Sequence, residues 1–253
     1  MRENQLKRKL ARGETVVGPF MNCSDPTFTE IVGLAGFDFA IIDMEHGPLS
    51  VDTATDLCRA AQGVGLEPII RVRKNDAPQI QRALDIGSAG VQVPQIEVGD
   101  DARAAVRAAK YAPLGMRGMS FFTRAGDYVL HGTEGLVDGL NAEQMVIIHV
   151  EGRRGLEHLD EIVAVPNLDV IFLGPYDLSQ SFGIPGQVND PRVVRGMEEA
   201  VLKIRAAGKV AGTFAADVET AKRWIGTGVQ YISMSVDVGI FARACRDLAA
   251  QFH

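Results

Sequence analysis

The sequence predicts one α/β domain built as a (β/α)8 barrel, and three observations support this fold class. Short apolar and β-branched runs alternate with longer amphipathic segments, and eight such strand–helix units follow one another. Most of the short runs are almost entirely apolar, as in AIID, PIIRV, MVIIHV and VIFLG, which is typical of parallel strands covered on both faces. The length of 253 residues suits one barrel, and no linker rich in Pro, Gly or Ser divides the chain.

The eight predicted strands cover residues 16–20, 39–43, 68–72, 90–93, 145–150, 170–173, 210–214 and 231–235. Helices are predicted between them, over 51–62, 77–85, 100–110, 191–207, 218–226 and 238–251. Several of these helices open with capping or first-turn residues, namely Ser50, Asp76, Asp100, Asp190 and Asp217. A doubly wound open sheet is the alternative arrangement. We favour the barrel because polar residues recur at the strand ends where barrel enzymes have their active sites.

Residues 111–144 interrupt this alternation. The segment is longer than a typical connection between a strand and a helix, and it is rich in glycine and aromatic residues. We expect an elaborated loop within the single domain 1–253. Such loops act as lids or subunit contacts, and a plain structural insertion is an equal alternative.

Composition excludes several classes of partner. The net charge is −6, and the sequence contains no long run of Lys or Arg, so neither nucleic acid nor an anionic membrane is an expected partner. No apolar run approaches the roughly 18 residues that a membrane span needs. The three cysteines, Cys23, Cys58 and Cys245, are scattered without metal-binding spacing, which indicates a reducing, cytoplasmic environment.

The second predicted strand ends in IIDMEHGP, which places Asp43, Glu45 and His46 at the mouth of the barrel. A carboxylate beside an imidazole is a pattern of proton transfer near neutral pH, so we interpret Asp43 as orienting His46. A loop histidine with a capping aspartate is the alternative.

In the third strand, Arg71 interrupts an apolar run and suits a substrate carboxylate or an oxyanion. A structural ion pair with a strand-end carboxylate is the alternative for Arg71.

The fifth strand places Ile147, His149 and Glu151 on one face and Ile148 on the other. Asp177 follows the sixth strand, so Glu151 and Asp177 are expected on adjacent strands at the same end of the barrel. Two carboxylates without an intervening cation indicate a site for Mg²⁺, Mn²⁺ or a similar divalent ion. The alternatives are an acid/base pair of the glycosidase kind and a purely structural role.

Two further patterns bear on the chemistry. The turn Gly174-Pro175-Tyr176 offers backbone N–H groups at a helix start, where an anionic group can bind, although such turns often only reverse the chain. Lysines other than Lys74 fall on predicted helices or exposed ends, Lys110 among them. A covalent-imine mechanism is therefore disfavoured, and a metal is the more natural electrophile.

Six segments carry a resemblance to a known family. They are FDFAIIDMEHGP, PIIRV, GVQVPQIE, YAPLGMRGMS, VEG and VIFLGPYDLS, and they occur in this order along nearly the whole chain. In combination they resemble the HpcH/HpaI family of class II pyruvate aldolases, within the phosphoenolpyruvate/pyruvate barrel superfamily. The resemblance is to aldolases acting on 4-hydroxy-2-oxoheptanedioate and on 2-keto-3-deoxy sugar acids. It implies a lyase with a (β/α)8 fold.

The resemblance also implies roles for individual residues. Glu151 and Asp177 match the family's metal ligands, in agreement with the carboxylate pattern. His46 matches the catalytic histidine, Asp43 the aspartate that orients it, and Arg71 the active-site arginine. The implied cofactor is a divalent metal ion, and the sequence does not choose among Mg²⁺, Mn²⁺, Co²⁺ and Zn²⁺.

The substrate pocket includes both matches and departures. The backbone of the turn matches the part of the family that holds the pyruvate carboxylate, which makes Gly174, Pro175 and Tyr176 substrate-binding residues. The bulk of Tyr176 is expected to narrow the pocket, and Phe214 to cover the bound pyruvate. His149 stands where the family often has Gln, which is expected to change the hydrogen bonds around the metal ligand.

Family members form domain-swapped dimers that assemble further, commonly into hexamers, with the last helix packed on a neighbouring barrel. The resemblance therefore implies a homo-oligomer of swapped dimers. The apolar face of residues 238–252 is compatible with that packing and equally with packing on its own barrel.

The functional hypothesis is reversible cleavage of a 4-hydroxy-2-oxo acid to an aldehyde and pyruvate, or a hydroxypyruvate-like 2-oxo acid, through a metal-stabilised enolate. His46 would serve proton transfer and Arg71 would stabilise the enolate oxygen. The main alternative is decarboxylation of oxaloacetate, or lyase chemistry on a related 2-oxo diacid, at the same metal site. A barrel that binds a 2-oxo acid without turnover is the alternative from another class.

Overall fold

Eight parallel strands form a closed barrel in the computed structural model, which describes residues 2–252. Each strand pairs with the next, and the first pairs with the last. The strands are β1 (Val16–Met21), β2 (Phe39–Asp43), β3 (Glu67–Arg71), β4 (Gly90–Val93), β5 (Met145–Val150), β6 (Val170–Leu173), β7 (Val210–Ala215) and β8 (Tyr231–Val236). The (β/α)8 prediction is confirmed, and all eight predicted strands are present with ends shifted by at most one residue.

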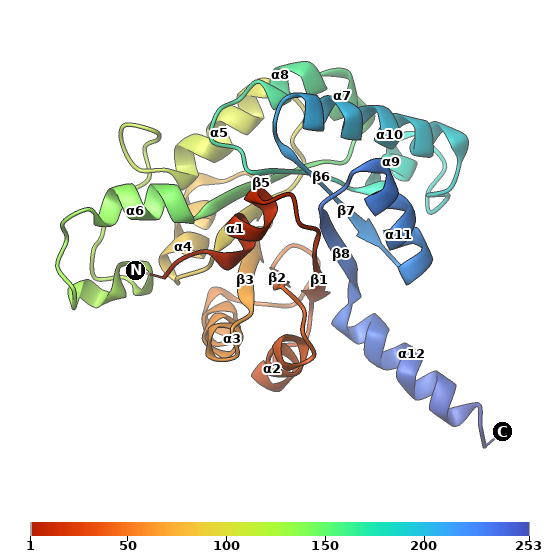
Figure 1. Cartoon of the computed structure of the whole chain (residues 1–253), viewed down its shortest axis with the longest axis horizontal. Coiled ribbons are helices and arrows are strands. Elements are labelled where there is room, and N and C mark those ends of the chain that lie inside the picture. The colour runs from red at the N-terminus through yellow and green to blue at the C-terminus, as the bar shows by residue number, and fades with distance from the viewer. Residues whose placement is uncertain (1, 253) are drawn as a thin grey trace.

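Helices surround the barrel (Figure 1). They are α1 (Gln5–Ala11), α2 (Pro26–Leu34), α3 (Val51–Gly63), α4 (Ala77–Asp85), α5 (Gly99–Ala109), α6 (Leu136–Glu143), α7 (Arg153–Glu157), α8 (Leu159–Val163), α9 (Pro175–Ser181), α10 (Pro191–Ala206), α11 (Val218–Thr227) and α12 (Asp237–Ala249), with a 3-10 helix, η1 (Arg124–Val129). The side chains of Ser50, Asp76, Asp190 and Asp217 accept hydrogen bonds from first-turn N–H groups, as their positions predict. Asp100 lies in the first turn of α5.

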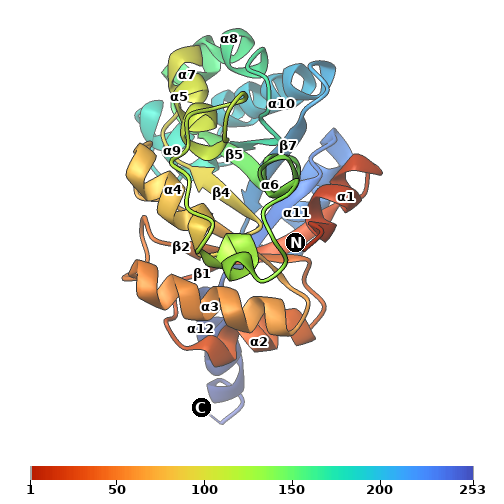
Figure 2. The same ribbon diagram turned by 90° about the vertical axis from the view of Figure 1, so that its left-hand side faces the viewer.

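The last helix, α12, extends away from the barrel in both views (Figures 1 and 2). Apolar side chains along it are exposed to solvent, with Phe241 58% and Leu248 61% exposed. Its start is fixed by Asp237, whose carboxylate accepts hydrogen bonds from the backbone N–H groups of Asn22 and Cys23. This buried aspartate therefore ties the direction of α12 to the end of β1.

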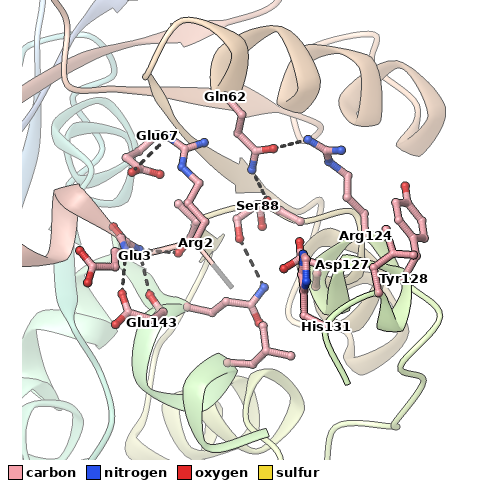
Figure 3. Close-up of a pocket in the computed structure, with 17 residues that line it drawn as sticks. Arg2, Glu3, Gln62, Glu67, Ser88, Arg124, Asp127, Tyr128, His131 and Glu143 are labelled. Carbon is pink, nitrogen blue, oxygen red and sulfur yellow. Dashed lines mark hydrogen bonds and ion pairs between the residues drawn. The ribbon is translucent and has the colours of Figure 1, made fainter. Parts of the chain in front are cut away.

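Helix α1 packs on the interior of the barrel through Leu6 and Leu10. A cavity of about 460 Å³ lies near the N-terminal end of the barrel, lined by residues 2–4, η1 and α6 among others (Figure 3). Its polar side chains largely bond to one another or to backbone. The Arg2 guanidinium lies 3.4 Å from Glu67, and Arg124 donates to Gln62. The residue range predicted as an elaborated loop supplies one wall of this cavity through η1 and α6.

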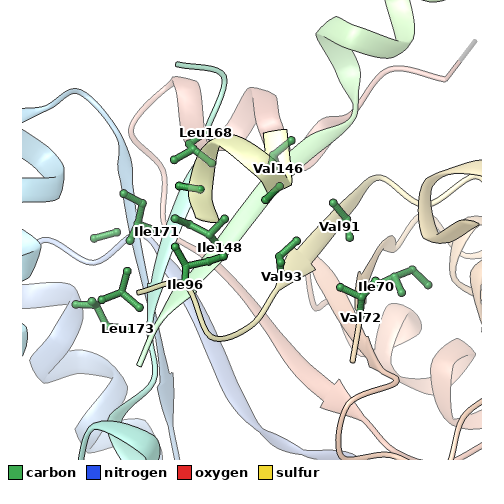
Figure 4. Packing of buried hydrophobic residues seen from close by; sticks show 14 of the residues in the cluster. Ile70, Val72, Val91, Val93, Ile96, Val146, Ile148, Leu168, Ile171 and Leu173 are labelled. Atoms are coloured by element: carbon green, nitrogen blue, oxygen red, sulfur yellow. The ribbon is translucent and has the colours of Figure 1, made fainter. Parts of the chain in front are cut away.

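Successive residues of the strands pack on opposite sides of the barrel wall. Side chains that point outward, such as Ile148 and Ile171, pack with the helices (Figure 4). Side chains that point inward, such as Ile147 and Phe172, fill the barrel together with Leu6 of α1. The predicted alternation in the fifth strand is thus correct, and it directs the odd-numbered positions of β5 into the barrel.

Candidate active site

A cavity of about 360 Å³ opens at the C-terminal ends of the strands, where barrel enzymes have their active sites. We call it the strand-end cavity. All ten residues predicted for the site line it: Asp43, His46, Arg71, His149, Glu151, Gly174, Pro175, Tyr176, Asp177 and Phe214. The barrel therefore brings together side chains that are up to 171 positions apart in the sequence, from Asp43 to Phe214.

Arg71 is held by two carboxylates. Its Nε and Nη2 donate to the two oxygens of Asp43 over 2.8 and 2.7 Å, and its Nη1 lies 3.1 Å from Glu45 Oε2. Asp43 and Arg71 are direct register partners on β2 and β3, which explains the bidentate contact between the guanidinium and the carboxylate. The guanidinium also lies 4.5 Å above the ring of Phe20. The ion pair considered as the structural alternative for Arg71 is thus present, and it fixes the guanidinium inside the cavity.

Asp43 contacts His46 through the backbone. Its Oδ1 accepts hydrogen bonds from the N–H groups of Glu45 and His46, over 3.0 and 3.3 Å. These bonds shape the turn after β2 and leave the His46 side chain exposed at the cavity wall. The pairing of Asp43 with the His46 imidazole stays a prediction.

Glu151 sits at the end of a buried polar chain. Its Oε1 accepts the N–H of Gln95 over 2.8 Å, and its Oε2 lies 2.9 Å from His149 Nδ1. The other ring nitrogen of His149 contacts the side-chain amide of Gln92, whose oxygen accepts from the Tyr231 hydroxyl over 3.2 Å. This arrangement assigns the Nδ1 proton of His149 to Glu151 and leaves Nε2 to accept from Gln92. His149 therefore orients Glu151, and the role of His149 beside a metal ligand stays a prediction.

The two predicted metal ligands differ in their electrostatics. Burial raises the pKa of Glu151, but His149, the Gln95 N–H and Arg71 together bring it below its usual value. For Asp177, burial raises the pKa, and the negative charge of Glu151 raises it further. The pKa of Glu45 is also raised, first by burial. A like-charge neighbour disfavours ionisation, so this cluster favours a cation.

The turn after β6 packs tightly against Glu151. A Cβ on Gly174 would lie 2.7 Å from the Glu151 Cβ and 2.9 Å from its Oε2, so this position needs glycine. The Gly174 N–H lies 3.4 Å from the Val150 carbonyl, and Pro175 has no N–H. Among the three predicted turn residues, Tyr176 therefore offers the N–H available for a ligand, since first-turn N–H groups have no partner within a helix.

A second cavity of about 260 Å³ adjoins the first and shares His46, Glu151 and Asp177 with it. We call it the acidic cavity because Glu45 and Glu97 also line it. Among residues 2–252, no group of three or more His, Cys, Asp or Glu side chains is arranged to hold a metal ion. A metal on Glu151 and Asp177 would thus take its remaining ligands from water or substrate.

Sequence reasoning missed Phe20, Asn22, Phe172 and Val236, which also line the strand-end cavity. Phe20 and Asn22 lie at and just beyond the C-terminal end of the first predicted strand, so the rule that identified Asp43 and Glu151 also applies to them.

Lys110 was expected on a predicted helix or at an exposed end, but the structure buries it, with 2% of its surface exposed. It lies near the start of β5, and its Nζ donates to the carbonyls of Asn141 and Gln144.

Comparisons with known proteins identify the family. Residues 17–244 match the model of the HpcH/HpaI aldolase/citrate lyase family. The chain is 34% identical to a 4-hydroxy-2-oxo-heptane-1,7-dioate aldolase of Shigella sonnei, covering 99% of this chain and 95% of that protein. It is 36% identical to a pyruvate aldolase of Rhizobium etli, covering 98% and 97%.

Solved structures agree with the sequence relatives. A HpcH/HpaI aldolase/citrate lyase family protein from Burkholderia cenocepacia has a TM-score of 0.94 and 32% identity, with 98% of this chain and 99% of that chain covered. The citrate synthase SbnG has a TM-score of 0.88 and 30% identity, with 97% and 96% covered. In the part of the chain that the structure describes, no helix has the length and apolar character of a membrane span. The chain belongs to the HpcH/HpaI aldolase/citrate lyase family.

Proposed function

We propose that this protein is a divalent-metal-dependent aldolase that reversibly cleaves 4-hydroxy-2-oxo acids into pyruvate and an aldehyde. The observation that carries the proposal is the convergence of Glu151, Asp177, His46 and Arg71 on one cavity at the C-terminal ends of the strands. Family membership and relatives named 4-hydroxy-2-oxo-heptane-1,7-dioate aldolase and pyruvate aldolase support it.

The donor set fits a divalent ion. Glu151 and Asp177 provide carboxylate oxygens, which hard divalent cations prefer. The pKa of Asp177 is raised by burial and by the charge of Glu151, and a cation between the two carboxylates would relieve that repulsion. When bound, such an ion supplies a Lewis acid that polarises the ketone of a 2-oxo acid. Mg²⁺, Mn²⁺, Co²⁺ and Zn²⁺ are the candidates.

The protein's own residues position the substrate and move the proton. Asp43 and Glu45 hold the Arg71 guanidinium in place, and its N–H groups not used in those contacts stabilise the enolate oxygen. The exposed imidazole of His46 serves the transfer of the 4-hydroxyl proton. The N–H of Tyr176 binds the pyruvate carboxylate.

The test is pyruvate release from a 4-hydroxy-2-oxo acid by protein stripped with a chelator and re-supplied with single divalent metals. Release that vanishes without metal and returns with it is the expected result, and the rates rank the ions. Glu151→Gln should not recover with any metal, whereas Glu157→Gln, an exposed position on α7, should behave like the unmodified protein. Oxaloacetate decarboxylation without any aldol cleavage would instead move the assignment to a decarboxylase.

The proposal includes a homo-oligomer in which α12 packs on a second copy of the chain, with a hexamer of swapped dimers as the expected assembly. The exposed apolar side chains of α12 and its extension away from the barrel support this packing. Sedimentation of the full chain, compared with a chain ending at residue 236, tests it: loss of the oligomer on truncation is expected.

The free state of all three cysteines supports a cytoplasmic location.

A further inference from the structure

Three polar side chains cross the apolar interior of the barrel. They are Tyr231 of β8, Gln92 of β4 and His149 of β5, and each is at most 1% exposed. The side chains around them are apolar, Ile69 and Ile147 among them. Burying a polar group is costly unless the group is hydrogen-bonded, so the bonds of these three residues indicate what the barrel retains them for.

The three side chains form the buried polar chain that ends at Glu151. The Tyr231 hydroxyl donates to Gln92 Oε1 over 3.2 Å, and the Gln92 amide contacts His149 Nε2. His149 Nδ1 in turn lies 2.9 Å from Glu151 Oε2. The His149 ring is stacked on Phe172, with centroids 4.4 Å apart and an interplanar angle of 18°. The chain thus runs from the first residue of β8 to the carboxylate at the strand-end cavity.

One orientation of the Gln92 amide satisfies all three contacts. With Oε1 toward Tyr231, the hydroxyl has an acceptor and the amide N–H donates to His149 Nε2. The ring proton then lies on Nδ1, where it faces Glu151. The reversed amide would leave the Tyr231 hydroxyl proton without an acceptor among the described residues. The Tyr231 hydroxyl therefore determines, through Gln92, which nitrogen of His149 carries the proton.

We propose that Tyr231 and Gln92 are positioning residues for the metal site. They act through His149, which holds the Glu151 carboxylate in the orientation that binds a divalent ion. The inference rests on the proposed function, in which Glu151 is a metal ligand. Glu151 Oε2 accepts from His149, and Oε1 accepts the N–H of Gln95 over 2.8 Å. These two bonds fix the rotation of the carboxylate, so the lone pairs left for a metal point in set directions.

The experiment measures Mn²⁺ binding to the full chain, with free Mn²⁺ followed by electron paramagnetic resonance, so that no turnover is needed. Gln92→Met keeps the side-chain length and removes the amide, and Tyr231→Phe removes only the hydroxyl. We expect the Kd for Mn²⁺ to rise roughly 10-fold or more in Gln92→Met and roughly 2- to 10-fold in Tyr231→Phe. His149→Phe should show a larger rise than either. Glu151→Gln should abolish the binding, which assigns the measured site.

A double variant and a control test whether the effect passes along the buried polar chain. Adding Tyr231→Phe to Gln92→Met should raise the Kd no further, because the hydroxyl then has no amide to orient. Ser233→Ala is the matched control. Ser233 is also fully buried on β8, two residues from Tyr231, and its hydroxyl has no hydrogen-bond partner among residues 2–252. The Kd of this variant should equal that of the unmodified chain.

The outcomes separate the inference from the proposed function. An unchanged Kd in both Gln92→Met and Tyr231→Phe, or an equal rise in Ser233→Ala, would overturn the inference, since side chains that only fill the barrel affect stability and not metal affinity selectively. Mn²⁺ binding without pyruvate release from a 4-hydroxy-2-oxo acid would overturn the proposed aldolase and leave the positioning of the metal site standing. An unmodified chain that binds no Mn²⁺ would overturn the metal site and the inference with it.

Discussion

The two ends of the barrel both hold clusters of charged side chains, but they differ in how those charges are partnered. At the N-terminal end, Lys110 Nζ donates to two backbone carbonyls, and Arg117 bonds both Gln144 and Asp85. At the C-terminal end, Asp177 faces two cavities and its pKa is raised by burial and by Glu151. Charged groups paired within the protein hold structure, whereas acceptors turned toward a cavity are available to a ligand.

The largest effect is expected from Arg117→Met at the N-terminal end. Arg117 is buried, and its loss leaves Gln144 Oε1 and Asp85 Oδ1 without the Arg117 donor. It also removes a cation–π contact with Tyr111 at 4.6 Å. The free energy of unfolding, measured with urea, should fall by about 3–5 kcal/mol. Arg103→Met breaks an exposed ion pair with Asp100 and should cost less than about 1 kcal/mol. Equal losses in the two variants would remove the distinction between the ends.

Asp177→Asn tests the open end. Pyruvate release should fall by roughly 10²–10³-fold, because the proposed metal ligand loses its charge. The free energy of unfolding should stay the same or rise slightly, since the substitution removes the repulsion with Glu151 that raises the Asp177 pKa. Asp160→Asn, on the surface of α8, is the control for both measurements. A variant that unfolds more easily and retains its activity would assign Asp177 to the structure instead.

The pH dependence of stability tests Lys110. Burial lowers the pKa of Lys110 to about 8, below the 10.5 of a free lysine. Between these values the unfolded chain binds a proton that the folded chain does not, so the free energy of unfolding should rise with pH. The gain over this window is at most about 3 kcal/mol, measured as the difference from Lys110→Met. A difference that stays flat from pH 8 to 10.5 would mean that Lys110 remains charged in its buried position.

Much of the fold could be predicted because each strand has a recognisable local sequence pattern. Short apolar runs such as MVIIHV and VIFLG are typical of buried parallel strands. The candidate site residues were predicted from the polar residues at the ends of these runs. Contacts set by register could not be predicted. Asp43 meets Arg71 because β2 and β3 pair at those residues, whereas the sequence offered for Arg71 only an ion pair with an unspecified strand-end carboxylate.

The burial of some polar side chains also could not be predicted from the sequence pattern. Lys110 lies at the end of a predicted helix, where a lysine is expected to be exposed. It is buried instead, and its Nζ donates to the carbonyls of Asn141 and Gln144, which are distant in the sequence. Gln92 is one polar residue within an apolar strand, and its link between Tyr231 and His149 depends on three strands closing around it.

The contact between Gly174 and Glu151 sets a rule for redesigning this protein. A library that varies acceptor preference can randomise positions 176 and 214, whose side chains border open space in the cavity. Position 174 must stay fixed in such a library, because any side chain there displaces the Glu151 carboxylate. The fixed position 174 and the adjustable position 176 thus lie two residues apart on the same turn.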